Sequence, residues 1–377
     1  LEMQGRLTEP MRYDAASDHY VPISWDDAFA MIGQHLRALD DPNQAEFYTS
    51  GRTPNEAAFL WAILGRSFGT NNFPDCSNMC HAPTSEGLPP AIGIGKGTCV
   101  MEDWDHAEAI FILGQNPGTN SPRMMTNLVE ARKRGAPIIA VNPMPERALI
   151  EFTEPQDVIQ MARFGHTDIA SDFLQIRIGG DLALLKGMMR ALFERDAAGE
   201  EVLDHDFIRD NTAGIEALRA DVMAHDWPEL VAACGLTEAK IRECADIYAK
   251  SNATMIAYGM GITQHQRGTE LVQQISNLLL LRGNYGKPGA GIVPVRGHSN
   301  VQGDRTVGIN EKPTALYLDR VRDAFGFEPP RAPGHNTVET VAAMEAGSVR
   351  VFIGMGGNFV RAVPDTERAY AAMRSVG

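Results

Sequence analysis

Cysteine is scarce in this 377-residue sequence, and its spacing excludes several kinds of site. The number of cysteines is odd and no C-x-x-C pair occurs, the residues being Cys76, Cys80, Cys99, Cys234 and Cys244. This pattern argues against a secreted disulfide framework, a structural zinc site and the cysteine run that holds an iron–sulfur cluster. A reducing, cytoplasmic setting is therefore expected.

Long apolar runs and a surplus of positive charge are also absent. No run approaches the roughly 18 residues of a membrane span, and the amino end does not resemble a signal peptide. The formal net charge of -14 would be repelled by a phosphate backbone, which makes nucleic acid and anionic membranes poor partners. The scattered acidic residues favour solubility instead.

Apolar material is plentiful, because 44% of the residues are hydrophobic. Apolar runs at 110–113 and 137–141, joined by a helical pattern over 122–134, predict a right-handed βαβ unit. A helix over 55–68 is expected to bury Phe59, Leu60, Ile63 and Leu64. Further strands are expected at 46–48, 173–178, 254–258 and 349–353, and further helices at about 24–39, 182–194, 205–211, 214–225, 237–250 and 268–281.

This alternation predicts an α/β fold with two intertwined lobes, each a mainly parallel sheet flanked by helices. The strand at 349–353 has no parallel partner nearby in the sequence. We therefore expect residues 1–74 and 304–377 to form one discontinuous lobe, and residues 75–303 to form a second lobe with a Rossmann-like sheet.

Several expected strands end in loops that contain glycine, asparagine or aspartate. In an open parallel sheet such loops meet at the carboxyl edge, where glycine lets a backbone N–H approach a phosphate. They indicate a nucleotide-like ligand, or they reflect connection geometry alone, which gives such turns in every α/β protein. A nicotinamide fold fits poorly, since no strand precedes the dinucleotide fingerprint. The candidate binding residues are Gly114, Asn116, Asn142, Asp181, Gly259, Gly261, Gln264, Gly356, Gly357 and Asn358.

The loop from Asp75 to Thr84 carries a cysteine directly followed by a histidine. The Cys80 thiolate would be a soft ligand for a redox-active transition metal, and His81 could move a proton at that metal. The other interpretation is that Cys80 packs in the core as a small hydrophobe.

The stretch 284–308 is too rich in glycine and polar residues for a packed element and too long for an ordinary connection. We interpret it as a binding loop. Arg296 could clamp a carboxylate bidentately and His298 could donate to it, although an arginine can equally be a solvated surface charge.

Together these stretches resemble the molybdenum or tungsten bis-molybdopterin guanine dinucleotide oxidoreductases, and within them the formate dehydrogenase alpha-subunit-like branch. The resemblance covers nearly the whole chain, and its fold is that of domains 1–3 of formate dehydrogenase and DMSO reductase, two intertwined α/β lobes. The residues that carry it are Asn78–Thr84, Gly114–Asn120, Gly180–Leu185, Gly259–Gln264, Gly283–Gly289 and Pro294–Gly297.

The resemblance implies a role for each candidate. Cys80 would be the protein ligand to the metal, His81 a proton acceptor beside it, and Arg296 the anchor of an anionic substrate. His298 stands where formate dehydrogenases commonly have glutamine, which puts the substrate pocket in question. The strand-end loops would hold the two guanine dinucleotide arms.

The implied reaction is the two-electron oxidation of formate to carbon dioxide at molybdenum or tungsten, with an electron acceptor or donor protein as partner. The family also has an amino-terminal portion, often with a 4Fe-4S cluster, and a carboxy-terminal β-barrel; neither is in this sequence, so the chain alone is expected to be inactive. Alternatives are a nitrate-type oxyanion reductase, a metal-free scaffold subunit of a respiratory complex and an unrelated nucleotide-binding protein.

Overall fold

The computed structural model describes residues 5–376 and divides into two compact units. Unit 1 contains the residues up to Met79 and those from His298 onward, and unit 2 contains Cys80–Gly297. The expected boundaries were 74/75 and 303/304, so the short segments 75–79 and 298–303 belong to unit 1 instead. No helix in the described part of the chain has the length and apolar character needed to cross a membrane.

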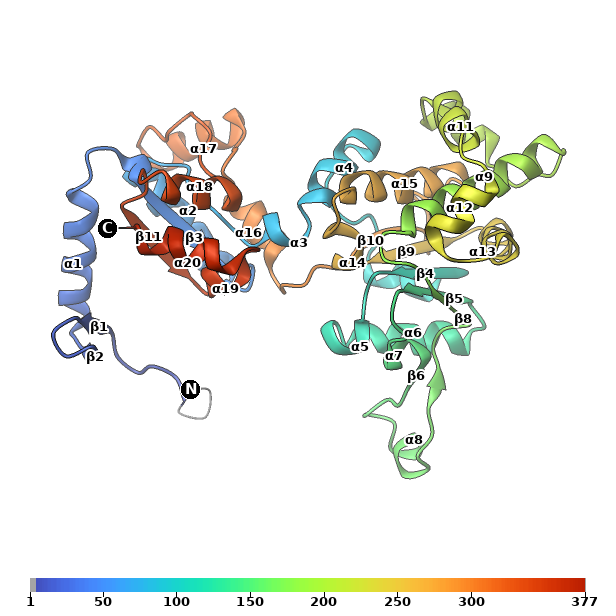
Figure 1. Ribbon diagram of the computed structural model, residues 1–377, viewed down its shortest axis with the longest axis horizontal. Coiled ribbons are helices and arrows are strands. Elements are labelled where there is room, and N and C mark those ends of the chain that lie inside the picture. Colours follow the sequence, from blue (N-terminus) through green and yellow to red (C-terminus); the bar gives the residue numbers. More distant parts are fainter. Residues whose placement is uncertain (1–4, 377) are drawn as a thin grey trace. The chain divides into compact units, whose positions relative to one another are not determined.

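Unit 2 is built on a five-stranded parallel sheet with the order β10–β9–β4–β5–β8 (Figure 1). The predicted βαβ unit is confirmed, because β4 and β5 pair in parallel and α6 (Met124–Lys133) connects them. The strands are β4 (Ala109–Leu113), β5 (Ile138–Asn142), β8 (Asp172–Gln175), β9 (Thr254–Tyr258) and β10 (Gly291–Pro294).

Strand β10 corrects the expectation that 284–308 contains no packed element. It pairs in parallel with β9, and its residue Ile292 is fully buried. Its first residue, Gly291, has a φ of 144°, and a side chain there would lie 2.4 Å from Thr98 and 2.7 Å from Cys99. The glycine that suggested a loop therefore reflects close packing of the backbone.

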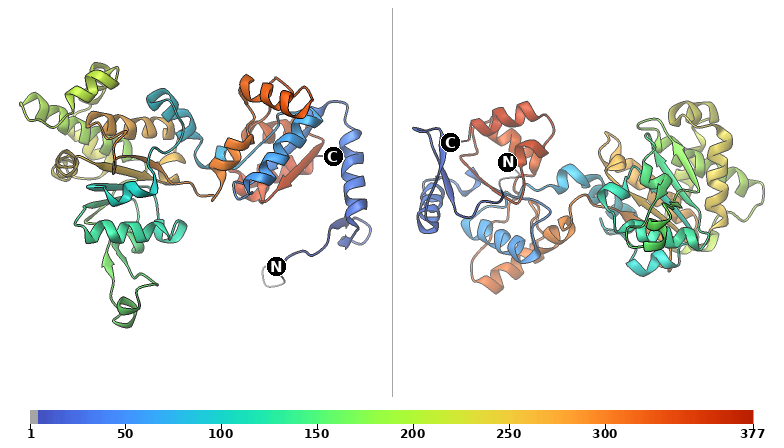
Figure 2. Two further views of the ribbon diagram at one scale, coloured as in Figure 1. Left: turned by 180° about the vertical axis from the view of Figure 1, so that it is seen from behind. Right: turned by 90° about the horizontal axis from the view of Figure 1, so that it is seen from below.

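The side chains of the unit 2 sheet point alternately to its two faces, and each face has its own hydrophobic core. Phe111 and Leu113 pack toward α9 (Asp181–Ala197), α13 (Glu238–Lys250) and α15 (Gly268–Leu281), whereas Ile110 and Ile112 pack toward α6. This is the two-residue period of a strand that is buried on both faces. Figures 1 and 2 show the two helical layers on opposite faces of the sheet.

The remaining elements of unit 2 are short and mostly helical. Helices α4, α5, α7, α8, α12 and α14 go beyond the predicted set, and α4 contains Pro89 and Pro90. These elements are α4 (Ala82–Ile92), η3 (Met101–Asp105), α5 (Pro117–Asn120), α7 (Arg147–Ile150), β6 (Glu151–Phe152), α8 (Val158–Ala162), β7 (Thr167–Asp168), α10 (His205–Asn211), α11 (Ile215–Met223), α12 (Trp227–Cys234) and α14 (Met260–Thr263).

Unit 1 contains a parallel pair formed by β3 (Ala45–Thr49) and β11 (Val351–Met355). The late strand thus finds its partner near the start of the chain, as its isolation in the sequence predicted. One face of the pair packs on α2 through Phe47, and the other packs on the last helices through Tyr48. The other elements are β1 (Met11–Asp14), β2 (His19–Pro22), α1 (Trp25–Arg37), η2 (Pro42–Gln44), α2 (Asn55–Phe68), α3 (Ser77–Cys80), α16 (Val301–Val307), α17 (Ala315–Phe325), α18 (Thr337–Glu345), α19 (Phe359–Ala362) and α20 (Thr366–Arg374).

Helix α2 has the predicted bounds but buries a different face. Leu60 and Leu64 are 67% and 48% exposed, whereas Ala58 and Ala62 are fully buried. A side chain at Gly65 would lie 2.6 Å from the ring of Phe73. Small residues therefore set the side that packs, because they let the helix approach its neighbours closely, and the prediction that the large residues are buried is wrong for these two leucines.

Arg66, at the end of α2, is buried without a carboxylate partner among the described residues. Its guanidinium donates to the carbonyl oxygens of Ala62, Gly308 and Asn310, and it lies over the rings of Phe73 and Tyr317. Burial lowers the pKa of Arg66 to about 10. Arg66 thus fixes the segment after α16 to α2.

Candidate functional site

The carboxyl edge of the unit 2 sheet gathers the predicted loops. Because the five strands are parallel, the segments that follow them all leave at one edge. The glycine-rich and asparagine-containing segments after β4, β5, β8 and β9 are therefore neighbours, as predicted. The correction to β10 adds a fifth, Val295–Gly297, so Arg296 belongs to the same edge.

Cys80 is 8% exposed and lies at the boundary between α3 and α4. The Thr263 hydroxyl donates to its carbonyl oxygen at 2.6 Å, which fastens Cys80 to the loop after β9. A side chain on Gly297 would lie 3.8 Å from the Cys80 sulfur. The two motifs that carry the candidate chemistry therefore meet within unit 2.

His81 is fully buried, and both of its ring nitrogens are engaged. Nε2 lies 3.0 Å from the carbonyl oxygen of Val295, and Nδ1 lies 3.0 Å from Thr84 Oγ1. Since a carbonyl only accepts, Nε2 carries the proton and Nδ1 accepts from Thr84. Thr84 in turn accepts from the Tyr258 hydroxyl at 2.8 Å. The ring therefore joins the Cys80 segment to β9 and to the segment after β10.

The electrostatics of this pocket keep His81 neutral. Burial, with the positive charge of Arg296 as a second cause, lowers the pKa of His81 to about 3. Proton uptake at Nδ1 would also require the Thr84 hydroxyl to turn its own proton away and accept from the ring instead. The role of proton acceptor stays a prediction, whereas a positioning role is visible in the contacts.

Arg296 is partly buried, and one of its terminal nitrogens donates to the carbonyl oxygen of Gly95 at 3.3 Å. It is therefore held against the Gly93–Gly97 loop rather than fully solvated. Its positive charge is the second cause of the lowered pKa of His81, after burial.

The glycines at the ends of β4 and β9 serve contact between two loops. A side chain on Gly114, whose φ is 56°, would lie 2.7 Å from the backbone of Gly261. A side chain on Gly261 would lie 2.7 Å from Gly114, and one on Gly259 would lie 2.8 Å from the same residue. The physical reason for these glycines is therefore the close approach of the two turns.

Buried polar groups at this edge are suited to a ligand with N–H donors. Asn142 Nδ2 donates to the backbone carbonyl of Gln115 at 2.8 Å, and the buried Gln115 Oε1 has no hydrogen-bond partner among residues 5–376. Asp181, at the first turn of α9, is 6% exposed, and burial raises its pKa to about 6. Gln115 is missing from the predicted site, although its position directly after a buried strand was a usable signal.

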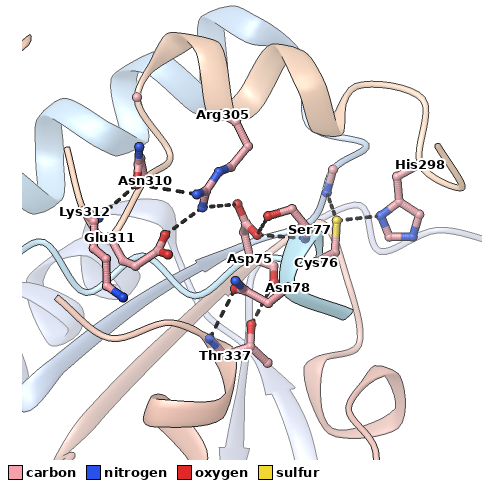
Figure 3. A network of polar contacts seen from close by, with 12 residues as sticks. Asp75, Cys76, Ser77, Asn78, His298, Arg305, Asn310, Glu311, Lys312 and Thr337 are labelled. Atoms are coloured by element: carbon pink, nitrogen blue, oxygen red, sulfur yellow. Dashed lines mark hydrogen bonds and ion pairs between the residues drawn. The ribbon is translucent and has the colours of Figure 1, made fainter. Parts of the chain in front are cut away.

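The other predicted binding residues lie apart from this group or have local roles. Asn116 caps α5 through the Thr119 N–H and donates to Glu146, and Gln264 is exposed after α14. Gly356, Gly357 and Asn358 follow β11 in unit 1, where Asn358 caps α19. His298 is also in unit 1, beside Cys76 (Figure 3). Their ligand-binding roles stay predictions.

The model of the molybdopterin oxidoreductase family matches residues 6–375. The chain belongs to this family. It is 55% identical over 372 residues to the protein YdeP of Escherichia coli, which covers 97% of this chain and 49% of YdeP. It is 29% identical over 365 residues to formate dehydrogenase H of Escherichia coli, covering 93% of this chain and 48% of that relative. The chain thus spans about half the length of these relatives.

A solved structure shows the same fold. Acetylene hydratase from Pelobacter acetylenicus matches with a TM-score of 0.71 at 16% identity, covering 98% of this chain and 51% of that chain. The predicted fold class, with parallel sheets flanked by helices, is confirmed.

Membership of the molybdopterin oxidoreductase family implies a molybdopterin cofactor with molybdenum or tungsten. The residues present fit such a group. Cys80 offers a soft sulfur ligand at the sheet edge, Gln115 offers a buried acceptor that has no donor within residues 5–376, and Asp181 offers a buried carboxyl group.

Proposed function

We propose that this chain is part of an enzyme that transfers two electrons between a small anionic substrate and molybdenum or tungsten, with formate oxidised to carbon dioxide as the leading reaction. The observation that carries the proposal is the contact between the Cys80–His81 segment and the segment Val295–Gly297 in unit 2. These two segments are the two ends of that unit in the sequence. The similarity to formate dehydrogenase H, over 93% of this chain, supports formate as the substrate.

Each candidate residue has a role within this proposal. Cys80 binds the metal through its thiolate, since sulfur is the soft ligand that such a metal favours. When bound, the cofactor supplies the metal that takes or gives the two electrons. Arg296 holds an anionic oxygen of the substrate, because a guanidinium offers parallel N–H donors to a carboxylate. His81 keeps these two segments in register. Accepting the proton that oxidation of formate releases is its second proposed role, and this role requires the Thr84 hydroxyl to stop donating to Nδ1.

The guanine dinucleotide form of the cofactor is also part of the proposal. Gln115 Oε1 and the Asp181 carboxylate accept from the N–H groups of a guanine base at the edge of the unit 2 sheet. The exposed turn Gly356–Asn358, at the end of β11 in unit 1, is the candidate for the second arm. Glycine at 356, with a φ of 81°, permits a turn there that other residues rarely adopt.

The electrons leave through a redox centre outside the described chain, for which a 4Fe-4S cluster is the candidate, to a partner protein. The reducing cytoplasm is the proposed location. None of the five cysteines in the described chain forms a disulfide, which supports a reducing compartment.

Substitution of Cys80 in the cofactor-loaded enzyme tests the proposal. Cys80→Ala should abolish formate oxidation and leave folding nearly unchanged, and Cys99→Ala, which removes a thiol outside the proposed site, is the matched control. Arg296→Lys keeps the charge but loses the planar fork, so kcat/KM for formate should fall about tenfold or more, each tenfold being about 1.4 kcal/mol.

The other outcomes distinguish the alternatives. Equal activity of Cys80→Ala and the parent would refute the metal-ligand role. A parent enzyme that reduces nitrate and ignores formate would be an oxyanion reductase. Lack of both metal and pterin in the intact protein would make it a scaffold subunit.

A further inference from the structure

Within unit 1, both backbone polar groups of Gly51 are hydrogen-bonded, one to Cys76 and the other to the loop that begins at His298. The Gly51 N–H donates to the Cys76 sulfur at 3.1 Å, and the Gly51 carbonyl accepts from the Asn300 N–H at 2.7 Å. A side chain on Gly51 would lie 2.8 Å from the Cys76 sulfur and 3.0 Å from His298 Cβ. The absence of a side chain at position 51 therefore brings a backbone donor, a thiol and an imidazole into one contact.

Cys76 also contacts the histidine ring directly. Its sulfur lies 2.9 Å from His298 Nδ1, and Cys76 is only 4% exposed (Figure 3). A contact of this length between sulfur and nitrogen contains one shared proton. The position of that proton decides which ring nitrogen of His298 is a donor.

Four arrangements of protons are conceivable, and two of them leave a proton on Nε2. If the thiol donates to Nδ1, the neutral ring carries its own proton on Nε2. If the pair is a thiolate and an imidazolium, both nitrogens are protonated. In the third, a thiolate accepts from a neutral ring and Nε2 is bare, which leaves a buried negative charge without a counterion in the pair. In the fourth, the sulfur of a neutral thiol accepts from Nδ1, and Nε2 is again bare.

The surroundings disfavour the third and fourth arrangements. Asp75, directly before Cys76, is a 2% exposed acid whose carboxylate pairs with Arg305, so a thiolate here would add a second buried negative charge. In the fourth, one neutral sulfur, a weak acceptor, would receive the N–H of Gly51 and that of Nδ1 together, whereas an imidazole nitrogen is the better acceptor. Burial and the positive charge of Arg52 lower the pKa of His298, which favours the neutral ring over the imidazolium.

We propose that Cys76 is a positioning residue that keeps the proton of His298 on Nε2, so that the ring acts as a hydrogen-bond donor to an anionic substrate. Contact of His298 with the substrate is the prediction made from the sequence and rests on the function proposed above, whereas the position of the proton does not. A fixed Nε2–H donor favours carboxylates and oxyanions, which accept hydrogen bonds. A substrate group that can only donate would face this N–H without forming a hydrogen bond, and its binding would be weaker. Cys76 would thereby set specificity without touching the substrate.

The proton position can be measured on the protein without any cofactor. In protein labelled with 15N-histidine, nitrogen chemical shifts report which ring nitrogen is protonated, and His298→Gln identifies the signal among the ten histidines. A protonated Nε2 in the parent, retained in Cys76→Ser and partly lost in Cys76→Ala, supports the proposal. A serine hydroxyl can still accept from Gly51 and donate to Nδ1, whereas alanine cannot. An unprotonated Nε2 in the parent would overturn it.

Kinetics of the cofactor-loaded enzyme test the consequence for the substrate. We expect Cys76→Ala to raise KM for formate about tenfold with kcat changed much less, because the lost donor acts on binding. Cys76→Ser should restore KM. In the His298→Gln background the glutamine amide donates without help, so Cys76→Ala should have no further effect.

Two results separate the failure of this inference from the failure of the proposed function. Equal effects of Cys76→Ala with and without His298 would show that the thiol acts elsewhere, and would overturn the inference. If the parent enzyme turned over neither formate nor nitrate, the proposed function would fail, and the nitrogen shifts would still decide whether Cys76 fixes the proton.

Discussion

Unit 1 should lose stability as the pH rises toward neutrality, because of one buried carboxyl group. Asp304, on α16, is 1% exposed. Its Oδ1 accepts from Asn300 at 3.1 Å, but the buried Oδ2 has no hydrogen-bond partner in the described chain. Burial, reinforced by the negative charge of Asp75, raises the pKa of Asp304 from 3.8 to about 7. The folded protein therefore holds a proton that the unfolded chain releases.

The sign and size of the effect follow from linkage. The contribution of Asp304 to the free energy of unfolding is highest below pH 3.8, falls as the pH rises, and levels off above about pH 7. Each pH unit between these values lowers it by about 1.4 kcal/mol, so this group alone costs about 3 kcal/mol between pH 5 and pH 8. Asp304→Asn is a neutral substitution of the same shape, and it should remove that loss.

Hydrogen–deuterium exchange measures the prediction within unit 1, since the two units need not unfold together. Amides of β3 and α16 should be more strongly protected in Asp304→Asn than in the parent, and the difference in their opening free energy should grow by about 3 kcal/mol from pH 5 to pH 8. Asp323→Asn, at a side chain that is 68% exposed, is the control and should match the parent at both pH values. If Asp304→Asn weakened protection at pH 8, the ionised carboxylate would be a stabilising group and the reasoning would be refuted.

Two further substitutions test packing. Arg66→Met should lower the free energy of unfolding by about 3 kcal/mol, measured by urea denaturation, because buried carbonyls such as that of Gly308 lose their donor; an unchanged midpoint would contradict this. Gly261→Ala should reduce both the melting temperature and the retention of cofactor, since the added carbon would lie 2.7 Å from Gly114. Gly93→Ala is the control, because a side chain at position 93 meets open space and its positive φ of 80° should cost only about 1 kcal/mol of backbone strain. If Gly93→Ala and Gly261→Ala lowered the melting temperature and the retention of cofactor equally, the contact between Gly261 and Gly114 would be ruled out as the cause.

The central strands of the unit 2 sheet, β4, β5 and β9, were predictable because they are buried on both faces. Such strands are continuous apolar runs, as at 109–113 and 254–258, and the turns that end them are marked by glycine and asparagine. Parallel pairing then brings those turns to one edge without further information. The partner of β11 was predictable by elimination, since its pairing with β3 spans the whole chain.

What could not be predicted depends on close approach rather than on pattern. Helix α2 has two apolar sides, and only the clash that a side chain on Gly65 would have with Phe73 decides which one packs. Strand β10 is four residues long and surrounded by glycine, so periodicity cannot separate it from a loop. Both errors came from reading glycine and alanine as positions without packing contacts. In the structure these small residues mark the places where neighbouring segments approach most closely.

The same distinction governs the candidate site. From the sequence, Gly114 and Gly261 indicate room for a phosphate, yet each has the backbone of the other where its side chain would be. The acceptors that remain available for a ligand are side chains, Gln115 Oε1 among them, and they stand on turns that those glycines hold together. A glycine motif at a strand end therefore predicts where a ligand site forms, while the residue beside the glycine is the one to substitute when ligand contact is the question. Gln115→Ala against Gly261→Ala would separate the two effects, because the first should weaken cofactor retention at an unchanged melting temperature and the second should change both.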